Sequence, residues 1–170
     1  SRVLGLFGER PPAVLLGVMG VTFLFSMFMS NTATTAMMLA VIAPVVASLG
    51  PTDPFGKALL LGVAFAANIG GMGTIIGTPP NAIAAGALAH TQPIGFPMWM
   101  ALGVPVALCL AGIMWLYLTI AYPCHRETVS LTALSDEDAE TRSLPVWKRI
   151  LVLGVFLSTV GLWLTETFHG

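Results

Sequence analysis

The sequence reads GGMGTIIGTPPN from Gly70 to Asn81. Its four glycines and two prolines disfavour a helix, because inside a helix a Gly costs about 1 kcal/mol and a Pro about 3 kcal/mol relative to Ala. Apolar residues continue on both sides, across residues 57–90. We therefore predict one long apolar helix that breaks at this segment, with Thr78 as the N-cap of its second half and Pro79 at the first helical position.

The composition around this break is that of a membrane protein. Of the 170 residues, 56% are hydrophobic and only 9% are charged, and the mean hydropathy is +0.87; a soluble domain carries roughly a quarter charged residues. No Asp, Glu, Lys or Arg occurs in residues 11–52 or 58–125. These two blocks exclude a soluble globular protein and predict an all-α, polytopic membrane protein. Unwound backbone at membrane depth lines a polar cavity or is buried in protein, so the break marks a candidate binding element.

Five apolar stretches predict the helices. The first two are marginal for crossing a membrane, since 19 residues reach about 28 Å and the hydrocarbon core is about 30 Å thick. A polar corner of only Asn31 and Thr32 joins these two stretches, so we interpret them as a re-entrant helical hairpin. Two full crossings are the alternative, and they would leave the later helices in the same orientation. The stretches are 12–30, 33–49, 57–90 with its break, 98–122 and 148–165.

This pattern divides the chain into five regions and orients them. With a hairpin that returns to its own side and two crossings after it, all seven Lys and Arg residues fall on one side, which the positive-inside tendency makes cytoplasmic. The cations are Arg2, Arg10, Lys57, Arg126, Arg142, Lys148 and Arg149. The regions are the hairpin (1–57), the broken transmembrane helix (58–97), a transmembrane helix (98–122), a cytoplasmic linker (123–147) and a last transmembrane helix (148–170).

Several classes of protein are disfavoured. A net charge of -1 and a pI near 6.2 provide no basic surface for nucleic acid. The two cysteines, Cys109 and Cys124, cannot form a disulfide framework, and we identify no cofactor site in them. The embedded blocks contain no Asp or Glu, which argues against an enzyme.

Polar residues gather at the expected hairpin tip. Thr22, Ser26 and Ser30 recur every four residues, which predicts three hydroxyls along one helix face leading to the turn. We expect Asn31 and Thr32 to cap the helix that follows, leaving its first N–H groups available to an anion. Because neither block contains Lys or Arg, such an anion would be held by helix ends, hydroxyls and a bound cation.

The break in the long helix offers a second set of polar groups. Free carbonyls around Gly77 suit a hard monovalent cation, and the N-terminus of the half-helix after it suits an anion. A purely structural interpretation stays open at this stage, because Ser and Thr often bond back to their own helix and the spacing of Gly73 and Gly77 can serve helix packing alone.

Two segments resemble the signatures of a known family. SNTATTAMM, from Ser30 to Met38, and GGMGTIIGTPPNAIAAG, from Gly70 to Gly86, resemble those of the divalent-anion/sodium symporter family, which includes dicarboxylate, citrate and sulfate carriers. The resemblance implies a homodimer with a scaffold domain and a moving transport domain, built from two inverted repeats that each supply an SNT hairpin and a broken helix. This chain contains one SNT, so it corresponds mainly to the first repeat.

The resemblance also implies a function. It predicts sodium-coupled symport of a di- or tricarboxylate, or of sulfate, by alternating access across the inner (cell) membrane, with sodium as the coupling ion and no other cofactor. A sodium-independent exchanger and a channel or structural membrane subunit are the alternatives. The second sodium site and the other half of the substrate site are expected outside these residues. The sodium ligands carried over are Ser26, Ser30, Asn31 and Gly77; the substrate residues are Ser30, Asn31, Thr32, Thr78 and Pro79.

Overall fold

The computed structural model describes residues 10–91 and 93–124, together with positions 147, 150, 151, 154, 155, 158, 159 and 161. In the two continuous ranges it contains five α-helices and no strand, which confirms the all-α fold class. Most of the expected linker (123–147) and most of the expected last helix (148–170) lie outside the described residues, as do five of the seven cations. The helices are α2 (Pro11–Ser26), α3 (Asn31–Leu49), α4 (Pro54–Gly71), α5 (Pro79–Leu88) and α6 (Phe96–Ala121).

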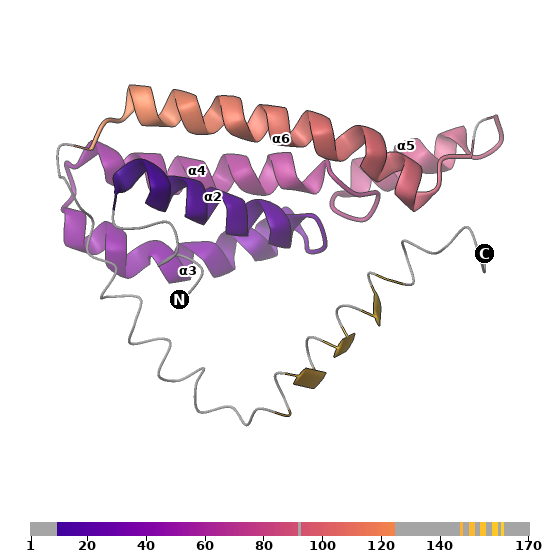
Figure 1. The fold of residues 1–170 in the computed structure, drawn as a ribbon, viewed down its shortest axis with the longest axis horizontal. Coiled ribbons are helices and arrows are strands. Elements are labelled where there is room, and N and C mark those ends of the chain that lie inside the picture. Colours follow the sequence, from indigo (N-terminus) through magenta and orange to yellow (C-terminus); the bar gives the residue numbers. More distant parts are fainter. Residues whose placement is uncertain are drawn as a thin grey trace.

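Helix α4 is the centre of the arrangement, with α2, α3 and α6 packed against it (Figure 1). Helices α2 and α3 form a hairpin whose turn, residues 27–30, lies at the same end of the bundle as the loop between α4 and α5, residues 72–78 (Figure 1). The hairpin tip and the break in the long helix, 40 or more residues apart in sequence, are therefore neighbours in space.

The core explains why α4 is central. Its most deeply buried positions, Ala58, Leu59, Val63 and Ala66, recur at the three- and four-residue spacing of one helix face and are fully shielded from solvent. Hydrophobic side chains of α2 and α3 cover this face. By length and composition α3, α4 and α6 are suited to cross a membrane. Helix α2, with 16 residues, reaches about 24 Å, and the re-entrant path of the hairpin stays a prediction.

A glycine fixes how closely α2 and α4 approach at the tip. A methyl group added at Gly70 would lie 2.4 Å from the carbonyl oxygen of Phe23, far inside van der Waals contact. The last turn of α2 therefore lies directly on the last turn of α4. Small residues permit such backbone contacts between membrane helices.

The structure corrects two details at the tip. Helix α2 ends at Ser26, so Ser30 lies beyond it and the predicted row of three hydroxyls on one helix face stops at two. Helix α3 begins at Asn31, and its N-cap is Ser30 rather than Asn31 and Thr32. The physical reason is that the Ser30 hydroxyl, two bonds from the backbone, accepts the N–H of Ala33 at 3.3 Å.

The broken helix forms as predicted. Helix α4 continues through both glycines to Gly71, residues 72–78 leave the helix, and α5 begins at Pro79 with Thr78 as its N-cap. Gly73 and Gly77 lie within the loop, so their spacing does not serve packing between two helices. Of the cations that the structure describes, Arg10 and Lys57 flank the starts of α2 and α4, at the end of the bundle away from the tip.

Candidate functional site

Three oxygen atoms converge where the hairpin tip meets α4. The hydroxyl oxygen of Ser26, which is fully buried, lies 2.6 Å from the carbonyl oxygen of Ala67 and 2.8 Å from Asn31 Oδ1. A serine hydroxyl carries one proton, so it can donate to only one of these two acceptors at a time. The cluster of Ser26 Oγ, Asn31 Oδ1 and Ala67 O, called the oxygen cluster below, is therefore one proton short. A small oxygen-binding cation would relieve this deficit.

A second asparagine holds the amide of Asn31 in this orientation. Asn31 Nδ2 donates a hydrogen bond to Asn68 Oδ1 at 3.0 Å, which turns Asn31 Oδ1 toward Ser26. Asn68 belongs to the last turn of α4 and its side chain is exposed, whereas Asn31 is half-buried. A chain of polar contacts thus runs from the buried hydroxyl of Ser26 to the surface of the tip.

Gly71 is the common neighbour of three residues that were predicted for the site. A methyl group added there would lie 2.5 Å from Asn31 Oδ1 and 2.6 Å from Thr78 Cγ2. A methyl group added at Gly77 would lie 2.3 Å from the carbonyl oxygen of Gly71. The start of α3, the end of α4 and the start of α5 therefore meet at a position where any side chain would separate them.

Two further side chains brace the loop. Asn81 Nδ2 donates to the carbonyl oxygens of Gly71 and Thr74, each at 2.8 Å, and so closes the break from the α5 side. The buried hydroxyl of Thr74 donates to the carbonyl of Met27 in the hairpin turn. The bond to Gly71 satisfies a carbonyl that the unwound segment leaves without a helical partner, and the bond to Thr74 adds to the one from the N–H of Gly77 at 3.3 Å.

The substrate residues predicted from the resemblance line the outside of the same corner. Ser30 and Thr32 are exposed at the first turn of α3, Thr78 is half-buried and Pro79 is exposed. The first two positions of α5 are prolines, which have no N–H. Of these two helix starts, α3 therefore offers more backbone N–H donors to an anion, while α5 contributes the positive end of its dipole.

Sequence reasoning did not single out Ala67, Asn68, Thr74 or Asn81 as members of this site. A signal was present for Asn68, because an amide side chain in an otherwise apolar membrane helix is a functional candidate. For the carbonyl of Ala67 there was none, since every residue has one.

One polar group beside the tip stays unsatisfied. The hydroxyl of Thr34, in the first turn of α3, is completely buried and has no hydrogen-bond partner among the residues that the structure describes. Thr22, by contrast, bonds back to the carbonyl of Val18 within its own helix at 2.7 Å, so its hydroxyl serves the helix alone.

The electrostatics of the site come from neutral groups. Residues 11–52 and 58–89 contain no Asp, Glu, Lys, Arg or His. Among the described residues no three His, Cys, Asp or Glu side chains are grouped so that they could hold a metal. Within these residues an ion would meet hydroxyls, amides, carbonyls and helix ends.

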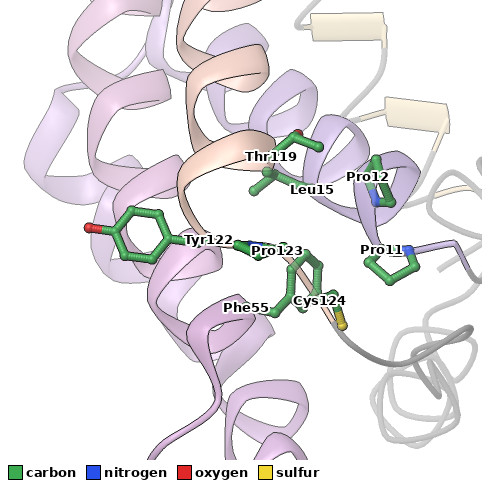
Figure 2. Close-up of a pocket in the computed structure, with 8 residues that line it drawn as sticks. All are labelled: Pro11, Pro12, Leu15, Phe55, Thr119, Tyr122, Pro123 and Cys124. Carbon is green, nitrogen blue, oxygen red and sulfur yellow. The ribbon is translucent and has the colours of Figure 1, made fainter.

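A cavity of about 250 Å³ lies at the other end of the bundle (Figure 2). It is lined mainly by apolar groups where α2 and α4 begin and α6 ends, and in Figure 2 the hydroxyl of Tyr122 points away from the other lining residues. This cavity is separate from the oxygen cluster. The lining residues are Pro11, Pro12, Leu15, Phe55, Thr119, Tyr122, Pro123 and Cys124.

Comparison with known proteins identifies relatives. The family model described as citrate transporter matches residues 1–169. The sodium-dependent dicarboxylate transporters of Staphylococcus saprophyticus and Staphylococcus aureus are each 31% identical to this chain over 182 residues. These alignments cover 98% of the chain and 35% of each relative, so the chain spans about a third of their length. By their names these relatives are transporters and not enzymes.

Proposed function

The chain belongs to the citrate transporter family, and we propose that it forms part of a secondary active transporter that couples sodium to the uptake of di- or tricarboxylates. Family membership and three helices of spanning length and composition make it a polytopic membrane protein. The observation that supports the proposal best is the oxygen cluster at the hairpin tip.

Sodium is proposed to bind at the oxygen cluster. A hard cation prefers oxygen ligands, and the cluster offers three: Ser26 Oγ, with Asn31 Oδ1 at 2.8 Å and Ala67 O at 2.6 Å from it. The single hydroxyl proton can serve only one of the two acceptor oxygens. Sodium would bind the lone pairs that the proton leaves unpaired. Ser30, at the N-cap of α3, and the backbone of Gly77, which lies against Gly71, complete the proposed ligand set.

A substrate carboxylate is proposed to bind outside the sodium, against Ser30, Asn31 and Thr32, with Thr78 and Pro79 beside it. The start of α3 supports this placement, because early N–H groups of a helix have no intrahelical partners and the dipole is positive there. No cationic side chain lies in residues 11–52 or 58–89, so within these residues sodium would supply the only full positive charge. This explains in physical terms why anion binding would require the cation.

The proposed transport mechanism is symport by alternating access. In this proposal the described residues supply one half of an inverted-repeat transporter that acts as a homodimer, and the other half of the substrate site comes from a second SNT hairpin. Detection of a second SNT and a second Gly- and Pro-rich break in the full-length protein would support it.

The test is uptake of radiolabelled succinate or citrate into proteoliposomes that contain the full-length protein. We expect uptake to follow an inward sodium gradient and to saturate. The substitution Asn31→Ala should abolish uptake while leaving membrane insertion intact. Normal sodium-driven uptake by that variant would refute the site, and counterflow that is indifferent to sodium would identify an exchanger instead.

A further inference from the structure

The hydrogen bonds at the tip are compatible with two arrangements of the same heavy atoms. In the structure, Asn31 Oδ1 faces Ser26 Oγ at 2.8 Å and Asn31 Nδ2 donates to Asn68 Oδ1 at 3.0 Å. Oxygen and nitrogen of a side-chain amide occupy nearly the same volume, so each amide can turn by 180° without repacking. The two amides must turn together, because a donor has to face an acceptor between them.

The two arrangements differ in how they treat Ser26. With the orientation in the structure, three oxygens share one proton, which favours a bound cation. With both amides turned, Asn31 Nδ2 would donate to Ser26 Oγ, and Ser26 would donate to the carbonyl of Ala67, 2.6 Å away. Asn68 Nδ2 would then donate to Asn31 Oδ1. Every polar atom of the cluster is satisfied in this second arrangement without a cation.

The same rotation changes what the exposed side chain of Asn68 presents to the tip surface. When Asn68 Oδ1 faces Asn31, its Nδ2 donors are left for an anion outside the cluster. When Asn68 is turned, its carbonyl oxygen takes that place and repels a carboxylate. Asn68 is exposed while Ser26 is fully buried, so the rotation connects the buried cation position to the accessible side of the tip.

We propose that Asn68 is a positioning residue whose amide turns together with that of Asn31 when sodium binds, and so prepares the tip for a carboxylate. The inference rests on the proposed sodium-coupled function and extends it to a residue outside the predicted site. It provides a local reason for sodium to bind before the anion, with no movement of the backbone.

The substitution Asn68→Asp tests the proposal in the full-length protein. A carboxylate only accepts hydrogen bonds, so it would hold Asn31 Nδ2 toward itself and keep Asn31 Oδ1 turned toward Ser26. It also removes the donors and adds a negative charge at the surface. We expect the half-saturating sodium concentration to fall about threefold and the KM for succinate to rise about tenfold. A merely structural role would move both constants in the same direction.

A second variant separates amide orientation from charge. Asn68→Leu removes every hydrogen bond of this side chain, which frees Asn31 to donate to Ser26, so the half-saturating sodium concentration should rise about tenfold. An effect of charge alone predicts no change in this variant. Binding of radioactive sodium to purified protein without succinate provides the same comparison if uptake is too slow. Thr52→Asp, in the exposed turn before α4, is the matched control for an added charge.

The outcomes are distinguishable. If Asn68→Asp moves both constants together, or if Asn68→Leu leaves sodium affinity within twofold, the role of Asn68 is overturned while the proposed function stands. If the unmodified protein takes up succinate without sodium, the proposed function fails and the role of Asn68 fails with it. Opposite shifts in Asn68→Asp, with weakened sodium binding in Asn68→Leu and no effect of Thr52→Asp, support the inference.

Discussion

Asn81 Nδ2 donates a hydrogen bond to the carbonyl oxygen of Gly71 at 2.8 Å, and this contact ties the first turn of α5 to the last residue of α4. The same Nδ2 atom also reaches the carbonyl oxygen of Thr74 at 2.8 Å. One side chain thus closes a seven-residue break, residues 72–78, that has left the helical hydrogen-bond pattern. The shape of the loop depends on this brace, because Gly73 and Gly77 disfavour helical backbone, and Pro79 and Pro80 have no N–H to donate to the loop carbonyls.

Replacing Asn81 by Leu should open the loop. The variant keeps the size of the side chain but removes the donor to the Gly71 carbonyl and leaves the Thr74 carbonyl with the longer 3.3 Å bond from the N–H of Gly77. A buried carbonyl without a donor costs about 1–3 kcal/mol. We expect a lower Tm of the purified protein and weaker binding of both sodium and succinate. Thr91→Ala, which removes a 3.3 Å contact at the exposed end of α5, should change stability by less than about 0.5 kcal/mol. Equal Tm values for the two variants would argue against the brace.

Ser26→Ala should weaken sodium binding specifically. Alanine fits the buried position, but the oxygen cluster loses its central ligand, so we expect the half-saturating sodium concentration for uptake to rise at least about tenfold. The measurement is succinate uptake as a function of sodium concentration. Ser48→Ala is the control, because that hydroxyl bonds only to the carbonyl of Val45 near the far end of α3. Unchanged sodium dependence in Ser26→Ala would exclude the cluster as the cation site.

Gly70→Ala should destabilise the packing of α2 on α4. The added methyl group would meet the backbone of Phe23 at 2.4 Å, and the resulting overpacking, about 1–3 kcal/mol, outweighs the gain of about 1 kcal/mol in helix propensity. Gly20→Ala adds a methyl group with nothing within 4 Å and should stabilise α2 by about 0.5–1 kcal/mol. Thermal unfolding in detergent compares the two, and a Gly70→Ala protein as stable as Gly20→Ala would contradict the close contact.

Thr74→Val should loosen the link between the loop and the hairpin turn. Valine preserves the shape of the threonine but removes the donor to the carbonyl of Met27, which costs about 1–2 kcal/mol. Hydrogen exchange should then become faster in residues 27–30 and 72–78 and stay unchanged in the middle of α4. If residues 27–30 and 72–78 exchange at the same rates in the variant and in the unmodified protein, other contacts hold the two turns together.

The local elements of this fold follow from the sequence for identifiable reasons. The two prolines after Thr78 select the start of α5, because the first turn of a helix does not need the N–H that proline lacks. The absence of charge predicted membrane helices, and α3, α4 and α6 have the length and composition for them. The N-cap of α3 is harder to predict, because Ser30, Asn31 and Thr32 are all good capping residues. Only the backbone geometry selects Ser30.

The composition of the candidate site was decided by the tertiary structure. Periodicity indicates which face of a helix is apolar, but it does not indicate the neighbour against which that face packs. Contacts such as Ser26 with Ala67 and Asn31 with Asn68 join residues 41 and 37 positions apart. They exist because Gly70 lets the ends of α2 and α4 touch. The sequence by itself determined the helices and their break, since these depend on local backbone preferences. The sharing of one hydroxyl proton between Asn31 Oδ1 and Ala67 O was decided by the tertiary structure, because only packing brings these separate segments together.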